Sequence, residues 1–185
     1  MRIVSGRFRG TKLYAPKSGA TRPTSDKVRQ AVFNVLAHGI EDFQIEGRRA
    51  LDLFAGTGAM GLEALSRGAR YCLFIEESAE ARAALRRNVE ALGLTGASRI
   101  WRRDATRLGP AGNLDAFGLA FLDPPYGRGM GERALAAMVE GGWIETGGIA
   151  VLEEAAGTEI DVPRGYELID QRRYGDTNVM ILRAL

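Results

Sequence analysis

The stretch Ala50-Leu51-Asp52-Leu53-Phe54-Ala55-Gly56-Thr57-Gly58-Ala59-Met60-Gly61 decides the fold of this 185-residue chain. Its first five residues are an apolar run interrupted only by Asp52, which is typical of a buried strand. Three glycines then follow in the spacing G-x-G-x-x-G, and residues 60–67 have the composition of a helix that stops at Gly68. A strand, a glycine-rich turn and a helix in this order favour an α/β domain that binds a nucleotide.

The rest of the chain alternates between apolar runs and helical periodicities. An amphipathic helix is expected from residue 26, and further helices at 78–92 and 132–139. We expect the other parallel strands at 71–76, 100–101, 119–122 and 149–152.

Two more strands are expected in the tail, at 166–173 and 177–182. The connection between them, Tyr174-Gly175-Asp176, is too short for a crossover helix, so these strands should pair antiparallel. The sequence thus predicts an α/β fold with a doubly wound, mainly parallel, seven-stranded sheet and an antiparallel C-terminal hairpin.

Composition excludes several classes of protein. With 45% hydrophobic residues the chain can bury one sizeable core. We therefore expect a single domain at 21–185, preceded by a basic arm at 1–20. The longest apolar runs are too short to cross a membrane and the first residues lack the pattern of a signal peptide, so a cytoplasmic location is expected. A monomer is expected because no additional dimerisation segment is visible. The single cysteine, Cys72, and the single histidine, His38, cannot supply a zinc site or a Ser-His hydrolase, and no metal is expected.

The net charge of +2 is distributed unevenly. Residues 1–30 have a net charge of +7, whereas the remaining residues have a net charge of −5. A basic arm on an acidic body indicates a polyanionic partner, and the alternative is a solvated surface hairpin without a specific role. On the first interpretation, the arm becomes ordered on contact with nucleic acid. The predicted RNA-binding residues are Arg2, Arg7, Arg9, Lys12, Lys17, Lys27 and Arg29.

The tetrapeptide Asp123-Pro124-Pro125-Tyr126 closes the strand expected at 119–122. An exocyclic amine on a base is a poor nucleophile, because its lone pair is delocalised into the ring. The Asp123 carboxylate and the Pro124 carbonyl can each accept one amine hydrogen, and the two prolines keep these acceptors on a stiff backbone. Tyr126 would stack on the base. The alternative is a Pro-Pro turn in which Asp123 is only a local cap.

Acidic residues at the ends of other predicted strands indicate the cofactor. Glu76 lies 20 residues beyond Gly56, where a carboxylate can accept from both hydroxyls of a ribose, although a surface acid is the alternative. Asp52 is awkward beside a pyrophosphate but suits the cationic amino group of a methionine moiety, so S-adenosylmethionine is preferred to a dinucleotide. Asp104 would accept from the adenine amine, unless it caps a helix.

The chain at this point resembles a known family, the bacterial methyltransferases that modify guanine N2 in 16S ribosomal RNA. The resemblance covers nearly the whole length. It depends on residues 1–10, the stretch 21–29, the turn and helix at 52–69, the tetrapeptide 123–126 and the tail segment 174–177. Phe8 and Thr11 depart from the pattern of the family, which affects only details of the RNA contact.

The resemblance implies a Rossmann-like class I methyltransferase that uses S-adenosylmethionine and acts on 16S rRNA in the small ribosomal subunit or its assembly intermediate. It also implies that Arg22 and Thr24 lie beside the cofactor groove. The predicted catalytic residues are Asp123, Pro124, Pro125 and Tyr126. The predicted cofactor contacts are Asp52, Phe54, Gly56, Gly58, Gly61, Glu76, Asp104, Ala105, Arg22 and Thr24.

Two alternatives remain open. An adenine-N6 DNA methyltransferase shares the tetrapeptide, but such an enzyme usually needs a separate recognition domain, for which 185 residues leave little room. A noncatalytic RNA-binding assembly protein on the same fold has no need of a pair of acceptors directed at an amine.

Overall fold

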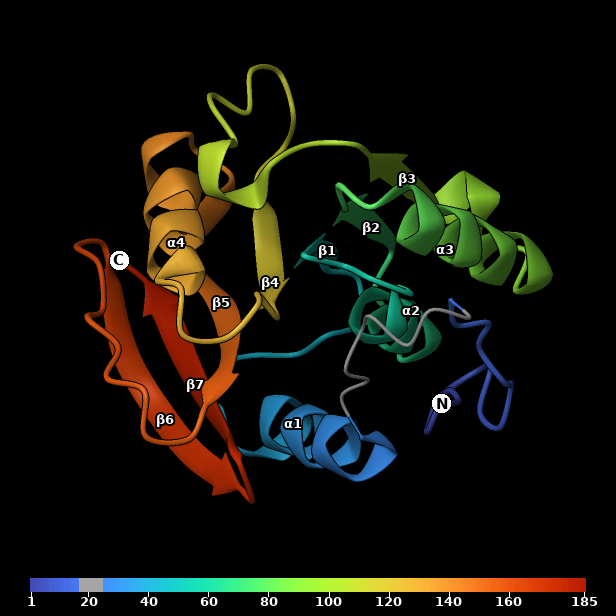
Figure 1. Ribbon diagram of the computed structural model, residues 1–185, viewed down its shortest axis with the longest axis horizontal. Helices are drawn as coiled ribbons and strands as arrows, with labels where there is room; N and C mark the ends of the chain where they lie inside the picture. Colours follow the sequence, from blue (N-terminus) through green and yellow to red (C-terminus); the bar gives the residue numbers. More distant parts are fainter. Residues whose placement is uncertain (17–24) are drawn as a thin grey trace.

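The computed structural model describes residues 1–16 and 25–185. Four α-helices and seven strands are defined in these ranges (Figure 1). The helices are α1 (Asp26–His38), α2 (Ala59–Ser66), α3 (Ala79–Ala91) and α4 (Met130–Glu140). The strands are β1 (Arg49–Leu53), β2 (Tyr71–Ile75), β3 (Ser98–Trp101), β4 (Phe117–Leu122), β5 (Ile144–Ala155), β6 (Tyr166–Tyr174) and β7 (Thr177–Ala184).

All seven strands form one sheet in the order β3-β2-β1-β4-β5-β7-β6. The first five pair in parallel, and β7 pairs antiparallel with both β5 and β6. This arrangement confirms the predicted fold class. Strand β5 is much longer than the expected 149–152, because it begins to pair with β4 at Ile144 and pairs with β7 as far as Ala155. The strand order reverses at β1 and β4, and open α/β sheets bind ligands at such a point.

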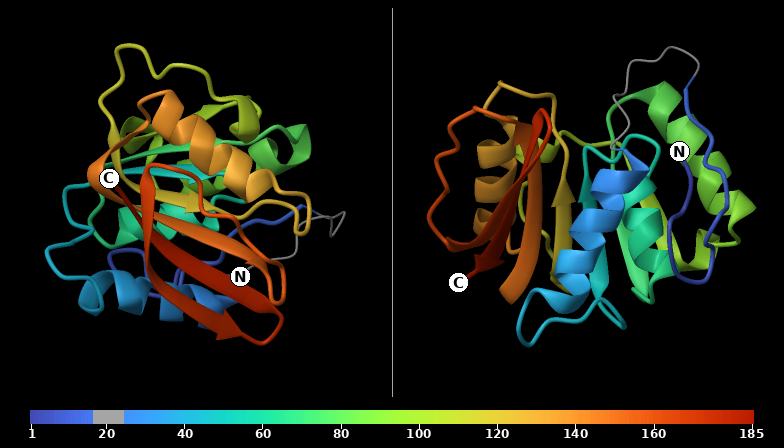
Figure 2. Two further views of the ribbon diagram at one scale, coloured as in Figure 1. Left: turned by 90° about the vertical axis from the view of Figure 1, so that its left-hand side faces the viewer. Right: turned by 90° about the horizontal axis from the view of Figure 1, so that it is seen from below.

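The helices cover both faces of the sheet, with α4 on one side and α1 on the other (Figure 2). Alternating side chains of each strand divide between the two faces. In β2, for example, Cys72 and Phe74 belong to the core beneath α1, α2 and α3, whereas Leu73 and Ile75 belong to the core beneath α4. No helix within the described residues is long and apolar enough to cross a membrane.

The position of Arg29 in helix α1 differs from the one predicted for an RNA contact. Its N-cap is Ser25, whose side chain accepts a hydrogen bond from the Val28 N–H. The guanidinium of Arg29 is fully buried, forms an ion pair of 2.7 Å with Asp26 and lies 3.6 Å from the carboxylate of Glu63. Arg29 is therefore an internal residue of the fold, and the prediction that it contacts RNA is wrong.

The N-terminal segment, residues 1–16, is an ordered part of the domain. Ile3 is fully buried, and the N–H groups of Val4 and Ser5 donate to the two carboxylate oxygens of Glu63 in α2. The Asn88 amide in α3 exchanges two hydrogen bonds with the backbone of Tyr14. The expectation of an arm that orders only on contact with nucleic acid is wrong for these residues, because buried side-chain acceptors hold their backbone.

Candidate active site

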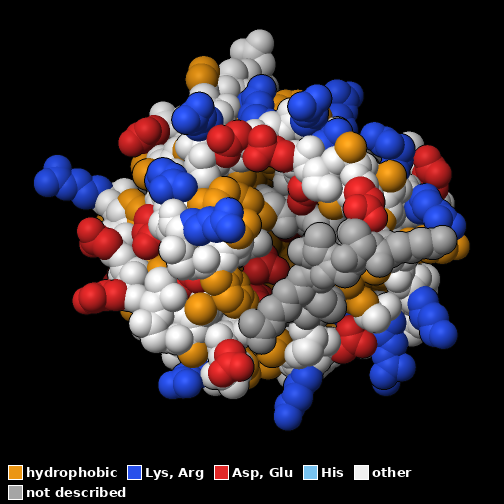
Figure 3. All heavy atoms as spheres, viewed as in Figure 1, with side chains coloured by type: hydrophobic (Ala, Val, Ile, Leu, Met, Phe, Trp, Pro, Cys, Tyr) orange, Lys and Arg blue, Asp and Glu red, His pale blue; other side chains and the backbone are white. Residues whose placement is uncertain are grey.

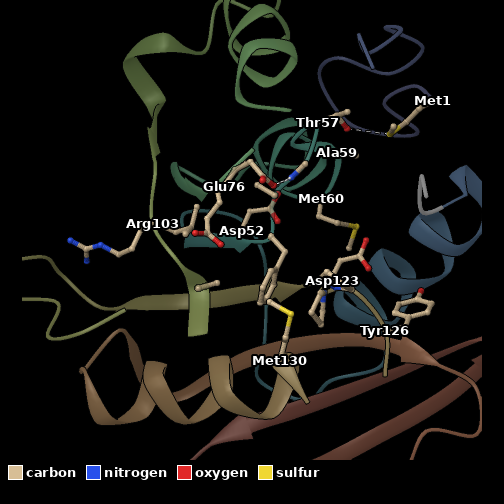
Figure 4. Close-up of a pocket in the computed structure, with 18 residues that line it drawn as sticks. Met1, Asp52, Thr57, Ala59, Met60, Glu76, Arg103, Asp123, Tyr126 and Met130 are labelled. Atoms are coloured by element: carbon tan, nitrogen blue, oxygen red, sulfur yellow. Dashed lines mark hydrogen bonds between the residues drawn. The ribbon is translucent and has the colours of Figure 1, made fainter. Parts of the chain in front are cut away.

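A cavity of about 460 Å³ opens at the carboxyl ends of β1, β2 and β4. Figure 3 shows acidic and hydrophobic side chains around a hollow near the middle of this face. The cavity receives Asp52 and Phe54 from β1 and its turn, Glu76 from the end of β2, and Asp123 and Tyr126 from the end of β4. In Figure 4, Asp52 and Glu76 lie together, and Asp123 and Tyr126 lie together across the cavity. Its size is that of a small-ligand site.

The turn after β1 has a backbone conformation that few residues adopt. Phe54 has φ of 59°, and Gly56 and Gly58 have φ of 55° and 81°. A bulky residue at positive φ is strained, and such strain persists where the surroundings enforce it, often at ligand sites. Phe54 and Gly56 both line the cavity. The turn thus brings the backbone close to the space that a ligand would occupy.

Gly58 and Gly61 are required for close packing, and their contact with the cofactor stays a prediction. Neither residue is among those that line the cavity. A Cβ at Gly58 would lie 2.2 Å from Leu85 Cδ1, and a Cβ at Gly61 would lie 2.4 Å from Phe74 Cε1. Glycine is required at both positions because α2 and α3 pack closely against the turn and β2.

Asp52 is a buried acid at the floor of the cavity. It is 3% exposed, and its Oδ2 accepts a hydrogen bond of 2.9 Å from the Gly61 N–H. Burial raises the pKa of Asp52 to about 8. The hydrogen bond from the Gly61 N–H lowers this pKa, and the nearby Glu76 carboxylate raises it. A ligand cation beside Asp52 would favour the ionised carboxylate. The site is therefore suited to a ligand that carries a positive charge at this point.

Glu76 follows β2 and holds the glycine turn. Its Oε2 accepts from the Gly56 N–H at 2.7 Å, and its Oε1 accepts from the Ser78 N–H at 2.8 Å. Each carboxylate oxygen can accept a second hydrogen bond. Glu76 can therefore bind a ligand hydroxyl while it fixes the turn.

The acid after β3 does not line the cavity. Asp104 caps the short 3-10 helix Ala105–Arg107, since its Oδ1 accepts from both the backbone N–H and the hydroxyl of Thr106. The hydrogen bond from the Thr106 hydroxyl has the largest effect on the pKa of Asp104. Together with the bond from the Thr106 N–H, it lowers this pKa. Its neighbours Arg103 and Ala105 line the cavity instead. Asp104 therefore acts as a helix cap, and its contact with the adenine amine stays a prediction. Ala105 lines the cavity.

The tetrapeptide after β4 lines the side of the cavity opposite Asp52. All four residues, Asp123 to Tyr126, border the space. The Tyr126 hydroxyl donates a hydrogen bond of 2.6 Å to Glu153 Oε1. The pKa of Tyr126 is raised, mainly by burial and also by this hydrogen bond. The phenol is therefore neutral, and its ring has a fixed anchor.

Sequence reasoning missed several lining residues. Thr57, Ala59 and Met60 belong to the glycine turn, and their positions follow from the motif that was recognised. Met130 begins α4, and Met1 reaches the cavity through the packed N-terminal segment, where its sulfur accepts from the Thr57 hydroxyl at 3.6 Å. No local sequence pattern indicates these two contacts.

The predicted RNA-binding side chains divide by location. Arg2, Arg7, Arg9, Lys12 and Lys27 are exposed. The predicted positions Lys17, Arg22 and Thr24 lie outside the described residues. No group of three or more potential metal ligands occurs in the ranges that the structure describes.

Comparisons with known proteins agree with this geometry. The putative rRNA methyltransferase YlbH of Bacillus subtilis is 35% identical over 99% of this chain and 98% of its own length. The ribosomal RNA small subunit methyltransferase D of Escherichia coli K12 is 38% identical over 78% of this chain and 69% of its own length.

Solved structures have the same fold. A putative methyltransferase from Escherichia coli, yhhF, is 29% identical and has a TM-score of 0.83, with 100% of this chain and 97% of that chain covered. The model of the family described as "Conserved hypothetical protein 95" matches residues 1–183. The chain therefore belongs to this family.

Proposed function

We propose that the protein transfers a methyl group from S-adenosylmethionine to the exocyclic N2 amine of a guanine in 16S rRNA. The proposal depends on one observation above all. The tetrapeptide Asp123-Pro124-Pro125-Tyr126 borders the same cavity as Asp52, Glu76 and the glycine turn. Acceptors for an amine thus lie across one space from residues suited to a charged nucleoside cofactor.

The residues of the cavity fit S-adenosylmethionine. Asp52, with its pKa raised to about 8, can bind a cationic amino group that restores its charge. Glu76 can accept from ribose hydroxyls, and the apolar side chains of Phe54 and Met60 can pack against the rest of the molecule. When bound, the cofactor supplies an electrophilic methyl group. A phosphate-bearing dinucleotide fits less well, because the Asp52 carboxylate lies beside the glycine turn, where its pyrophosphate would bind.

The residues of the tetrapeptide would make the amine nucleophilic. Asp123 Oδ and the Pro124 carbonyl each accept a hydrogen bond from the amine. These two bonds favour a tetrahedral nitrogen with a localised lone pair. The ring of Tyr126 stacks on the base and keeps it in place. The base has to be presented unstacked, as in an RNA loop or after extrusion from a helix.

The RNA substrate is proposed from two independent sources. Relatives that are 35% and 38% identical carry the names of rRNA methyltransferases. The exposed Arg7, Arg9 and Lys12 of the N-terminal segment supply positive charge for phosphate contacts. The choice of guanine N2 follows the family resemblance of the sequence.

Methyl transfer followed by nucleoside analysis tests the proposal. Unmodified small ribosomal subunits, naked 16S rRNA and duplex DNA are incubated with labelled S-adenosylmethionine and then digested to nucleosides. We expect label in N2-methylguanosine from ribosomal material, and the comparison of particle with naked RNA identifies the form of the substrate. Label confined to N6-methyladenine in DNA would replace the proposal with the DNA enzyme, and no label in any substrate would favour the noncatalytic assembly protein.

A further inference from the structure

The loop after β4 is attached to the end of β5 by two consecutive carboxylates. Glu153 Oε1 accepts from the Tyr126 hydroxyl at 2.6 Å, and Glu154 Oε1 accepts from the Gly127 N–H at 2.9 Å. Glu153 is 9% exposed and Glu154 is 1% exposed. The side chain of one loop residue and the backbone of the next are thus held by neighbouring buried acids.

The antiparallel strand β7 supports this attachment. In the pairing of β5 with β7, Glu153 lies opposite Val179, and Ala155 lies opposite Thr177. The Thr177 hydroxyl lies 3.5 Å from that of Tyr126, and Glu154 Oε1 also accepts from the Ala155 N–H at 2.8 Å. The two acids therefore sit on a rigid, hydrogen-bonded part of the sheet.

We infer that Glu153 is a positioning residue for methyl transfer, because it fixes the ring of Tyr126 beside Asp123 through the tyrosine hydroxyl. The inference rests on the proposed function. Glu154 assists by holding the loop backbone at Gly127. The C-terminal strands then have a role at the active site, since they hold the wall against which the target base stacks.

A stacking role alone does not require the hydroxyl. Phenylalanine presents the same ring, so Tyr126→Phe would retain full activity if stacking were the only contribution of this residue. A hydrogen bond from a phenol to a buried carboxylate is short and strong, and it fixes both the tilt and the position of the ring. A ring free to turn would admit poorly aligned bases, which lowers the rate of transfer without loss of cofactor binding.

The test compares Glu153→Ala, Glu153→Gln, Tyr126→Phe and the double variant Tyr126→Phe/Glu153→Ala. The control is Glu145→Gln, because Glu145 lies on the same strand but forms an ion pair with Arg48 at its other end. For each variant, kcat and KM are measured on unmodified small ribosomal subunits, and the Kd of S-adenosylhomocysteine is measured by calorimetry. Circular dichroism and thermal melting monitor folding.

We expect Glu153→Ala and Tyr126→Phe each to lower kcat/KM by about tenfold to hundredfold. The kcat/KM of the double variant should be no more than about twofold below that of the less active single variant, because both changes remove the same contact. Glu153→Gln keeps an acceptor oxygen and should recover most of the activity. The Kd of S-adenosylhomocysteine should stay within about twofold in every variant, and the control should behave as the wild type.

Three results would overturn the inference while the proposed function stands. These are full activity of Glu153→Ala, multiplied effects in the double variant, and loss of cofactor affinity in parallel with activity. A wild-type protein that methylates no ribosomal substrate would instead overturn the proposed function, and the inference with it.

Discussion

Cofactor binding should release a proton from Asp52. The pKa of about 8 means that about 0.9 of the free protein molecules carry this proton at pH 7. The amino group of the cofactor, with a pKa of about 7.7 to 8, is mostly cationic at that pH. An adjacent cation lowers the pKa of a carboxyl group by about 1 to 3 units, so ionisation of Asp52 on binding at pH 7 should release about 0.4 to 0.9 proton.

The same linkage predicts the pH dependence of affinity. Because the bound state prefers the ionised carboxylate, the affinity for S-adenosylhomocysteine should rise by about twofold to eightfold between pH 6 and pH 7. Above pH 8 the ligand loses its own charge and the affinity should fall again. The optimum then lies near the shared pKa of the two groups.

Calorimetry in two buffers measures the released protons directly. S-adenosylhomocysteine is titrated at pH 7 in phosphate and in Tris, whose ionisation enthalpies differ greatly, and the difference in heat gives the number of protons. Asp52→Asn, which keeps the shape but cannot ionise, should release almost none. The reasoning would be refuted by a release below about 0.2 proton from the wild type, or by equal release from the variant.

Three other predictions concern the fold and the RNA surface. Glu63→Gln should lower the free energy of unfolding by about 1 to 3 kcal/mol in urea titrations, because it removes one of the two carboxylates that pair with the buried Arg29. A change below about 0.5 kcal/mol would contradict this account. Gly58→Ala should lower the free energy of unfolding by about 1 to 3 kcal/mol, because Gly58 has φ of 81° and a Cβ there would overlap with Leu85. The control is Gly93→Ala, which also has positive φ but would bring its Cβ within 4 Å of no other atom. Neutralising Arg7, Arg9 and Lys12 should weaken RNA binding and reduce the slope of log K against log salt by about 2 in filter-binding assays, and an unchanged slope would place the phosphate contacts elsewhere.

The fold could be predicted because its determinants are local. The apolar runs at β1, β2, β4 and β5 alternate with helical periodicities, and parallel pairing follows from this alternation. The glycine spacing and the acids at the strand ends also identified Asp52 and Glu76 as neighbours in space. Both signals depend on short stretches of sequence.

Contacts between distant segments could not be predicted in this way. Arg29 is of a residue type that usually lies at the surface. Its burial depends on two carboxylates, Asp26 in the same helix and Glu63, 34 positions away in the chain. The attachment of Tyr126 to Glu153 likewise depends on how β4 and β5 pair. Asp104 shows a different limit. An acid after a strand suits both a ligand and a helix cap, and only its hydrogen bond with Thr106 shows that it forms the cap.

The central claim is that Asp123 acts on the acceptor amine, whereas Glu76 across the cavity acts on the cofactor. The most direct test is to measure, for Asp123→Ala, both the single-turnover rate of methyl transfer and the Kd of S-adenosylhomocysteine. The account predicts a rate at least about a hundredfold lower with a Kd within about threefold of the wild type, and the reverse pattern in Glu76→Ala. Equal losses of rate and cofactor affinity in Asp123→Ala would contradict it.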